Sequence, residues 1–434
     1  MEAPEQPAQA TTLPPSARPS RLFSNLNPSS LKHEPGSVLG AAALVAGTAV
    51  GAGILAIPAI TAESGFAASS VALVGGWAFS VATGLLIAEV NINLLCEVGA
   101  GRGVSISSMA QRTLGDAGSS IVSLCYAGLH YALLVAYIAK AGEIVQQLTG
   151  VPEWAADAAF AALFGGLCFS ARAKTLDTVN SVLVAAVVAT FLGLVGVAVT
   201  DLRPEQLATA NWGAVPDTLP VIMLSFVFHN IVGTIATSLE GDVQKIRQAI
   251  ILGSGVPLLM FLAWDAAVLG SSGEELLLQA GTAAGADPLA ALRATGGALV
   301  APLIDAFSFL AVATSFIGFI LGLNDFWSDR LQLPTGARQP LPYLLTLGPP
   351  LLLALSLGPA VFLDALDFAG TYGVLVLFGL IPVAMVWSER YARPPTTLSR
   401  TEIVPGGQLV LLAVGGSAAA IIGRELLLSI TQRL

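Results

Sequence analysis

The chain has 434 residues, of which 55% are hydrophobic and only 11% are charged. A soluble globular protein carries about a quarter charged residues, so this composition excludes an ordinary soluble domain and favours a membrane protein. The net charge of −9 argues against nucleic acid as a partner, because no basic surface would neutralise its phosphates. The three cysteines form neither a CxxC pair nor a metal-ligand spacing, and we expect no metal and no cofactor.

Residues 1–36 differ in composition from the rest of the chain. They are rich in Pro, Ser and Ala and contain no apolar run ahead of a cleavage site, which excludes a secretory signal peptide. This composition predicts a disordered cytoplasmic tail followed by a transmembrane domain over residues 37–434. A plastid transit peptide is the alternative, although Glu2 and Glu5 lie where such peptides avoid acidic residues.

Eleven apolar stretches approach the length of about 20 residues that a membrane-spanning helix needs. They are Val38–Ile60, Phe66–Ile87, Ser119–Ala139, Ala155–Ser170, Thr178–Thr200, Thr218–Leu239, Gln248–Ser272, Gly296–Asn324, Gln339–Leu363, Phe368–Ser388 and Ile403–Gly423. The fourth is the weakest, because it is short and begins beside Glu153 and Asp157. The ninth contains Pro349 and Pro350, which predict a kink. The sequence therefore predicts an all-α integral membrane protein with eleven spans.

The distribution of Lys and Arg predicts how these spans are oriented. With a cytoplasmic N-terminus, about fourteen of these residues lie on the inner side and about four on the outer side, with Lys140 ambiguous. An excess of Lys and Arg is typical of the cytoplasmic loops of membrane proteins. We expect a cytoplasmic N-terminus and an outer C-terminus in the plasma (inner) membrane, with a plastid envelope as the alternative.

Two spans contain interruptions near their centres. The first reads Gly47-Thr-Ala-Val-Gly-Ala-Gly53, followed by Ile54-Leu-Ala-Ile-Pro58, and these glycines and the proline weaken a helix. The sixth places His229 and Asn230 in an otherwise uncharged stretch. Interrupted spans at matching positions in two five-helix halves are typical of inverted-repeat transporters. The halves are expected over residues about 37–200 and 215–390, with an extra helix at about 403–423.

Broken helices offer main-chain groups to a zwitterion. The N–H groups exposed near Gly51 and Gly53 carry partial positive charge and suit a carboxylate. The carbonyl ends suit an ammonium group or a cation. Close packing of small residues is the alternative explanation for the glycines.

Four segments together resemble the tryptophan/tyrosine permease family of the amino acid–polyamine–organocation superfamily. They are Gly47-Thr-Ala-Val-Gly-Ala-Gly-Ile-Leu-Ala-Ile-Pro58, Gly241-Asp-Val-Gln-Lys-Ile-Arg247, Ala313-Thr-Ser-Phe-Ile-Gly318 with Asp325-Phe-Trp-Ser-Asp329, and Phe368-Ala-Gly370 with Pro382. The resemblance implies a LeuT-like 5+5 inverted repeat with discontinuous helices 1 and 6. It also implies import of tyrosine, tryptophan or phenylalanine by proton symport with alternating access, and a substrate between helices 1, 3, 6 and 8.

The candidate substrate-binding residues come from three of these helices. They are Thr48, Ala49, Gly51, Gly53, Tyr126, His130, Ser225, Phe226, His229 and Asn230. Tyr126 and His130 share a helix face on which an aromatic substrate could stack, or they form an interhelical pair. Tyr131 and Tyr137 are expected to serve packing or the membrane interface. We expect Glu89 to be a structural partner for a helix end rather than a proton carrier.

His229 is the candidate for proton coupling, because an ionisable residue near the bilayer centre is a functional hypothesis. Its alternatives are substrate contact and a neutral interhelical hydrogen bond. A sodium site is the alternative coupling site, formed by Gly47 and Val50 with Ala311, Thr314 and Ser315, which resemble the sodium site of sodium-coupled relatives.

Other functions are weighed against this hypothesis. A broader neutral amino acid transporter is the alternative within transport. A membrane-embedded enzyme would need paired carboxylates, a metal set or a nucleophile with its base, and only His130, His229 and Asp305 are identified as clearly embedded ionisable residues. A channel would show a filter or a ring of charges. We therefore expect no enzymatic activity, with a small-molecule amino acid, H+ (or Na+) and the lipid bilayer as partners.

Overall fold

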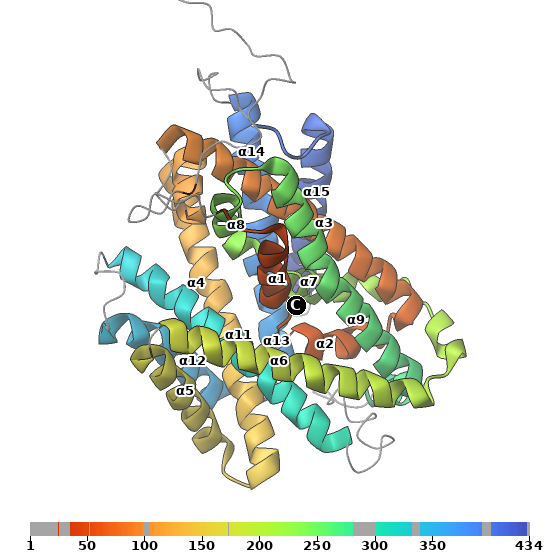
Figure 1. Ribbon diagram of the computed structural model, residues 1–434. Coiled ribbons are helices and arrows are strands. Elements are labelled where there is room, and N and C mark those ends of the chain that lie inside the picture. The colour runs from red at the N-terminus through yellow and green to blue at the C-terminus, as the bar shows by residue number, and fades with distance from the viewer. Residues whose placement is uncertain are drawn as a thin grey trace, which may run out of the picture.

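The computed structural model describes residues 25, 35–51, 53–98, 105–171, 173–280, 300–331, 339–392 and 401–431. These residues form helices and contain no strand, which confirms the all-α prediction (Figure 1). Most of the predicted tail, residues 1–36, lies outside the described part of the chain.

The helices follow the order of the predicted spans. The first half contains α1 (Val38–Ala49), α2 (Gly53–Thr61), α3 (Gly65–Val98), α4 (Ile106–Thr149), α5 (Glu153–Ser170), α6 (Ala173–Ala198), η2 (Val199–Asp201) and η3 (Pro204–Ala208). The second half contains α7 (Val215–Ser225), η4 (His229–Ile231), α8 (Val232–Ser238), α9 (Val243–Ala280), α11 (Val300–Arg330), α12 (Pro340–Leu357), α13 (Val361–Phe368), η5 (Ala369–Leu380), α14 (Ile381–Trp387), η6 (Ser388–Ala392) and α15 (Gly407–Thr431).

Within the described ranges, 9 helices are long and apolar enough to cross a membrane, or up to 10 if the bent pair α1 and α2 forms one span. Uninterrupted helical residues from Val361 to Ala392 count as one of these spans, although η5 and η6 are π-helical. The fourth predicted span coincides with α5, which is helical but is not among the candidate spans. Glu153 and Asp157 lower its hydropathy, as the sequence suggested.

The boundary between the ninth and tenth predicted spans is wrong. α12 continues through Pro349 and Pro350 but ends at Leu357 rather than Leu363. Gly358 has φ 70 and ψ −173, a conformation that glycine adopts without the steric cost of a side chain, and the chain turns there. The next helix, α13, then begins at Val361, seven residues before the predicted Phe368.

Eight of the predicted spans pack as helices in two groups. One group joins the broken first span, α3, the broken sixth span and α9, through contacts of α1, α2 and α3 with α9 and of α2 and α3 with α7. The other joins α4, α5, α11 and α12, which contact one another. α6 lies against α11 and α9, whereas η5 lies against α4, α7 and α15. The two groups thus contain spans 1, 2, 6 and 7 and spans 3, 4, 8 and 9.

The segment ahead of α1 is bound to the end of α8. The Gly36 N–H donates to the Ser238 carbonyl at 2.9 Å. Asn25 donates its main-chain N–H to Glu240 Oε1 at 2.7 Å, and its side-chain amide donates to the carbonyls of Thr237 and Ser238 at 2.9 and 3.1 Å. The Gly36 bond joins the beginning of the first span to the end of the sixth.

Candidate substrate-binding site

The first span is broken at the glycines that the sequence singles out. α1 ends at Ala49, α2 begins at Gly53, and the two helices are bent by 57° (Figure 1). Val50 has extended backbone angles, φ −77 and ψ 97, while its N–H still donates to the Ala46 carbonyl. The predicted interruption at Gly51 is therefore present, and α2 starts a new helix. In its first turn the Ile54 N–H donates to the Gly51 carbonyl at 3.2 Å, whereas the other N–H groups of a first helical turn lack a partner within the helix.

The sixth span is interrupted as well. α7 ends at Ser225, and regular helix resumes only at the short η4 turn that begins with His229. The N–H groups of Phe226 and Val227 donate to the carbonyls three residues earlier, at 3.4 and 3.2 Å. These contacts close the end of α7 and leave Phe226–Phe228 outside a regular α-helix.

The two breaks lie against each other. A Cβ atom on Gly53 would lie 2.5 Å from Ser225 Oγ and 3.0 Å from Ser225 Cα, so the start of α2 touches the end of α7. A Cβ atom on Gly51 would lie 2.6 Å from Ser315 Oγ of α11. The structure thus brings Gly51, Gly53, Ser225 and Ser315 together, from three different spans.

Tyr137 joins this group, which sequence reasoning did not expect. It is 4% exposed on α4, and its hydroxyl lies near Ser315. Its ring packs edge-on against Phe319, with 5.8 Å between ring centroids. Tyr137 follows His130 by seven residues, which is two helical turns on one face, and this spacing could have identified it.

His229 packs away from this meeting point, against α3 and η5. Its Nε2 lies 2.8 Å from Thr83 Oγ1, and its ring is stacked between Phe228 and Phe378 at centroid distances of 4.8 and 4.7 Å. Among the described residues, its buried Nδ1 has no hydrogen-bond partner. This geometry fits the predicted interhelical hydrogen bond and leaves one ring nitrogen available.

Tyr126 and His130 share a face of α4, as predicted, and that face lies against α11. Their ring centroids are 4.0 Å apart, and His130 Nδ1 lies 2.8 Å from the Tyr126 carbonyl oxygen. Phe319 and Phe326 contact the pair, and a Cβ on Gly322 would lie 3.2 Å from both polar ends. The pair therefore packs against the part of α11 that follows Ser315.

The other candidate residues lie in varied surroundings. Phe226 is fully buried, and its ring packs against Phe261 of α9. Asn230 is exposed although it lies within a span. Thr48 and Thr314 donate to carbonyls of their own helices, at Leu44 and Ala311.

The remaining candidates differ mainly in burial. Ala49 and Ala311 are buried and Val50 is half-buried, whereas Gly47 is exposed. A Cβ atom on Gly47 would meet nothing within 4 Å.

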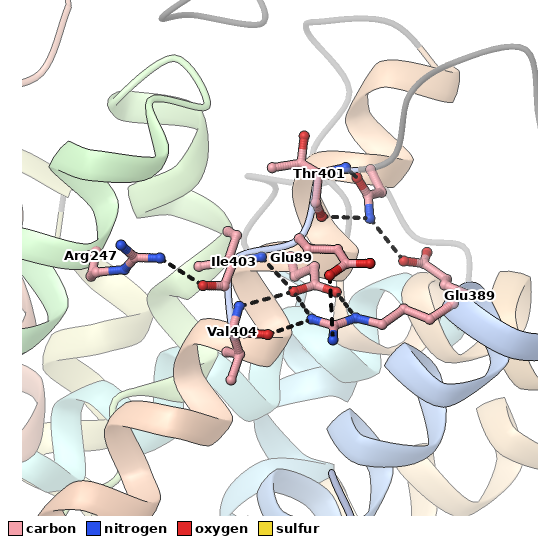
Figure 2. Close-up of polar contacts among 9 residues, drawn as sticks. Glu89, Arg247, Glu389, Thr401, Ile403 and Val404 are labelled. Carbon is pink, nitrogen blue, oxygen red and sulfur yellow. Dashed lines mark hydrogen bonds and ion pairs between the residues drawn. The ribbon is translucent and has the colours of Figure 1, made fainter. Parts of the chain in front are cut away.

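Glu89 has the structural role that the sequence predicts. Both of its oxygens accept hydrogen bonds from the Arg390 guanidinium at 2.7 Å, and the N–H of Ile403 also donates to it (Figure 2). Arg247 donates to the Ile403 carbonyl at 2.7 Å. The network joins the end of α3, η6, the beginning of α9 and the segment before α15, so it holds together four elements of one end of the bundle.

Comparison with known proteins gives this bundle a family. The model of the tryptophan/tyrosine permease family matches residues 34–422. The chain belongs to this family. The permease family model thus spans both broken helices and the Glu89 network, and it confirms the resemblance that the sequence motifs indicated.

Several transport proteins are similar to this permease. The tyrosine-specific transport system 2 of Haemophilus influenzae is 30% identical over 82% of this chain and 88% of its own length. The tryptophan-specific transport protein of the same organism is 28% identical over 82% of this chain and 89% of its own length. Glutamine transporter 2 of Aliivibrio fischeri is 27% identical, over 86% and 95%. The chain is therefore a multi-pass membrane protein and an amino acid transporter, and not an enzyme.

Proposed function

We propose that this permease imports aromatic amino acids by proton symport with alternating access. The observation that carries the proposal is the contact between Gly53 and Ser225, which places the start of α2 and the end of α7 side by side. The first offers N–H groups to a carboxylate, and the second offers carbonyls to an ammonium group. A zwitterionic amino acid matches both without a charged side chain.

The aromatic preference is supported by the surroundings of the breaks. Tyr137 lies near Ser315, and its ring packs against Phe319. Aromatic side chains such as these pack favourably against an aromatic ligand. Relatives named for tyrosine and tryptophan transport support the same substrate class. Tyr126 and His130 remain candidates for the substrate's aromatic end, further along the same face of α4.

We propose that the fold has eleven spans in a LeuT-like 5+5 inverted repeat. The two groups of spans, 1, 2, 6, 7 and 3, 4, 8, 9, repeat after five spans, and both first members of the repeats are broken. α5 is included as a span because its ends match those of α12. Tyr343, at the start of α12, bonds to the Cys168 carbonyl near the end of α5, and Gly358 lies beside Glu153.

Contacts between connecting segments support the proposed orientation. Segments expected on the inner side of the membrane contact one another: Glu89 forms an ion pair with Arg390, and Gly36 donates a hydrogen bond to Ser238. Segments that should lie outside also meet, as Asp217 bonds to Arg424. We propose that the side with most of the Lys and Arg residues is the cytoplasm, so that the N-terminus lies inside and the C-terminus outside, in the plasma membrane.

Proton coupling remains the preferred mode, with His229 as a candidate whose Nδ1 has no hydrogen-bond partner among the residues that the structure describes. Sodium coupling is the alternative, through Gly47, Val50, Ala311, Thr314 and Ser315. Of these residues, Ser315 lies beside the first break. A broader neutral amino acid specificity is the second candidate function, favoured by the similarity to a glutamine transporter.

Uptake in proteoliposomes tests the proposal. Purified protein is reconstituted, and radiolabelled tyrosine, tryptophan, phenylalanine and glutamine are supplied under an inward pH gradient, an inward sodium gradient or neither. We expect accumulation of the aromatic substrates under the pH gradient only. Accumulation of glutamine alone, or dependence on sodium alone, would contradict the substrate class or the coupling ion respectively.

A further inference from the structure

An acidic residue that the sequence analysis overlooked lies inside the seventh span. Asp265 is in α9 and has no exposed surface. The expectation that His130, His229 and Asp305 are the clearly embedded ionisable residues is therefore incomplete. A carboxyl group in a membrane span is costly to ionise and usually has a function.

Two hydroxyl groups bind this carboxyl group. Thr61 Oγ1, at the end of α2, lies 2.6 Å from Asp265 Oδ1. Ser69 Oγ, near the beginning of α3, lies 2.7 Å from Oδ2. Both carboxyl oxygens are thus bonded, and both partners are neutral.

No described cation balances the charge of Asp265. α1, α2 and the part of α3 that precedes Glu89 contain no charged residue. Of the nearby outer segments, Glu63, Arg203 and Glu205 are exposed, and no ion pair joins any of them to Asp265 in the described part of the chain. α6 contributes only apolar residues and Thr190 along its outer half. The ionised carboxylate of Asp265 would therefore be stabilised by the Thr61 and Ser69 hydroxyls and by no described cation.

Each hydroxyl also has a second acceptor, so the hydrogen bonds can form in two patterns. Thr61 Oγ1 lies 2.6 Å from the Ile57 carbonyl, and Ser69 Oγ lies 3.1 Å from the Phe66 carbonyl. A hydroxyl has one hydrogen and two lone pairs. If Asp265 is ionised, Thr61 and Ser69 both donate to it. If Asp265 is protonated, Oδ1–H donates to Thr61, which then donates to Ile57, while Ser69 still donates to Oδ2.

The site therefore accepts a proton without leaving a carboxyl oxygen unbonded. It is also connected to the substrate site through α2. Thr61 is the last residue of this short helix, and Gly53, its first residue, contacts Ser225. A helix of this length spans about 13 Å, and it contains Pro58 between its two ends. A change in the bonds at Thr61 thus acts on the half-helix that forms one side of the break.

We propose that Asp265 binds the coupled proton and transmits its protonation state to the substrate site through α2. The proton from the outer side forms the O–H bond of the carboxyl group, and the same proton leaves to water on the inner side. This inference rests on the proposed proton symport and names its proton site.

Asp265→Asn is the deciding variant, because asparagine resembles the protonated carboxyl group in shape and charge. In proteoliposomes, we expect this variant to lose accumulation of tyrosine under an inward pH gradient, by at least tenfold. Exchange of external labelled tyrosine for internal tyrosine should stay within about twofold of the wild-type rate, because exchange needs no release of the proton. Asp157→Asn is the matched control, since Asp157 is another buried acid on α5 with one oxygen unbonded among the described residues; it should accumulate tyrosine normally.

The outcomes are distinguishable. If wild-type protein exchanges tyrosine but ignores a pH gradient, the proposed proton symport fails. If the wild type responds to the pH gradient and Asp265→Asn responds equally, or if the folded variant loses exchange as well, Asp265 is not the proton site. Loss of the pH response in His229→Gln with its retention in Asp265→Asn would assign the proton to His229.

A second variant covers the case in which Asp265→Asn does not fold. The double variant Thr61→Val with Ser69→Ala keeps the carboxyl group and removes the donors that its ionised form needs. We expect exchange to persist and net accumulation to fall at least fivefold, because release of the proton becomes unfavourable. Undiminished net accumulation would contradict the inference.

Discussion

The first residue of α2, Gly53, lies against the last residue of α7, Ser225. A Cβ atom on Gly53 would lie 3.0 Å from Ser225 Cα, so the obstacle is main chain as well as the hydroxyl. Main chain cannot rotate away as a side-chain tip can. This contact fixes how closely the two broken spans approach, and it decides how much space remains for a ligand.

Gly53→Ala should therefore separate the two breaks. We expect the initial rate of tyrosine uptake to fall by roughly tenfold, the effect of about 1.4 kcal/mol, while the protein still inserts and purifies as a single species. Gly75→Ala is the matched control, because a Cβ on this helical glycine of α3 would meet nothing within 4 Å. Equal uptake by both variants would remove the Gly53–Ser225 contact from the site.

Gly51 and Ser315 form a second close pair, which a double-mutant cycle can test. A Cβ on Gly51 would lie 2.6 Å from Ser315 Oγ but 3.7 Å from Ser315 Cβ. Gly51→Ala should cost about 1 kcal/mol of stability, because the Ser315 hydroxyl has to rotate away from the new methyl group, and Ser315→Ala should recover most of it by removing the oxygen. Thermal unfolding in detergent measures this. Simply additive losses in the double variant would mean that the two residues do not touch.

Tyr137 offers a test of the aromatic side of the site. Tyr137→Phe keeps the ring that packs on Phe319 and removes the hydroxyl near Ser315. We expect the KM for tyrosine to rise by roughly fivefold, because the bound substrate would lose a hydrogen bond to this hydroxyl of about 1 kcal/mol, with the melting temperature nearly unchanged. Tyr343→Phe is the control, since its hydroxyl bonds to the Cys168 carbonyl away from the breaks. A larger KM effect in the control would contradict the placement of the site.

The Glu89–Arg390 pair should matter for stability. Both side chains are buried, and Glu89 also accepts the Ile403 N–H, so Arg390→Met leaves a buried carboxylate without its cation. We expect a loss of about 3–5 kcal/mol and a clear drop in melting temperature. Lys245→Met removes an exposed pair with Asp242 at 3.5 Å and should cost at most about 1 kcal/mol. Similar losses in the two variants would show that the buried network adds nothing.

The two helix breaks could be predicted from the sequence, because each depends on a few neighbouring residues. Glycines from Gly47 to Gly53 indicated the first break, and the polar pair His229 and Asn230 indicated the second. Both breaks are present because such residues weaken a helix through their own local preferences. The ninth span was placed too long because apolar residues continue to Leu363, past Gly358, whose positive φ ends the helix.

The contacts of the site depend on tertiary structure and could not be predicted in this way. Asp265 is separated from Thr61 and Ser69 by 204 and 196 residues, so no local pattern connects them. Tyr137 was assigned to packing because its relation to Ser315 depends on how α4 lies against α11. His229 was expected to serve proton coupling or substrate contact, and the stacking of its ring between two phenylalanines beside Thr83 could not be read from its own segment. Which candidates bind substrate stays a prediction.

Asn25 and Gly36 hold the start of the first span on the last residues of α8. Any motion that parts α1 from α8 must break the Gly36–Ser238 hydrogen bond, because Gly36 lies two residues ahead of the first residue of α1. An affinity label or fluorescent fusion placed before Asn25 would adjoin the residue that makes three hydrogen bonds to Thr237, Ser238 and Glu240. Labels for purification or imaging therefore belong after α15, at the opposite end of the chain.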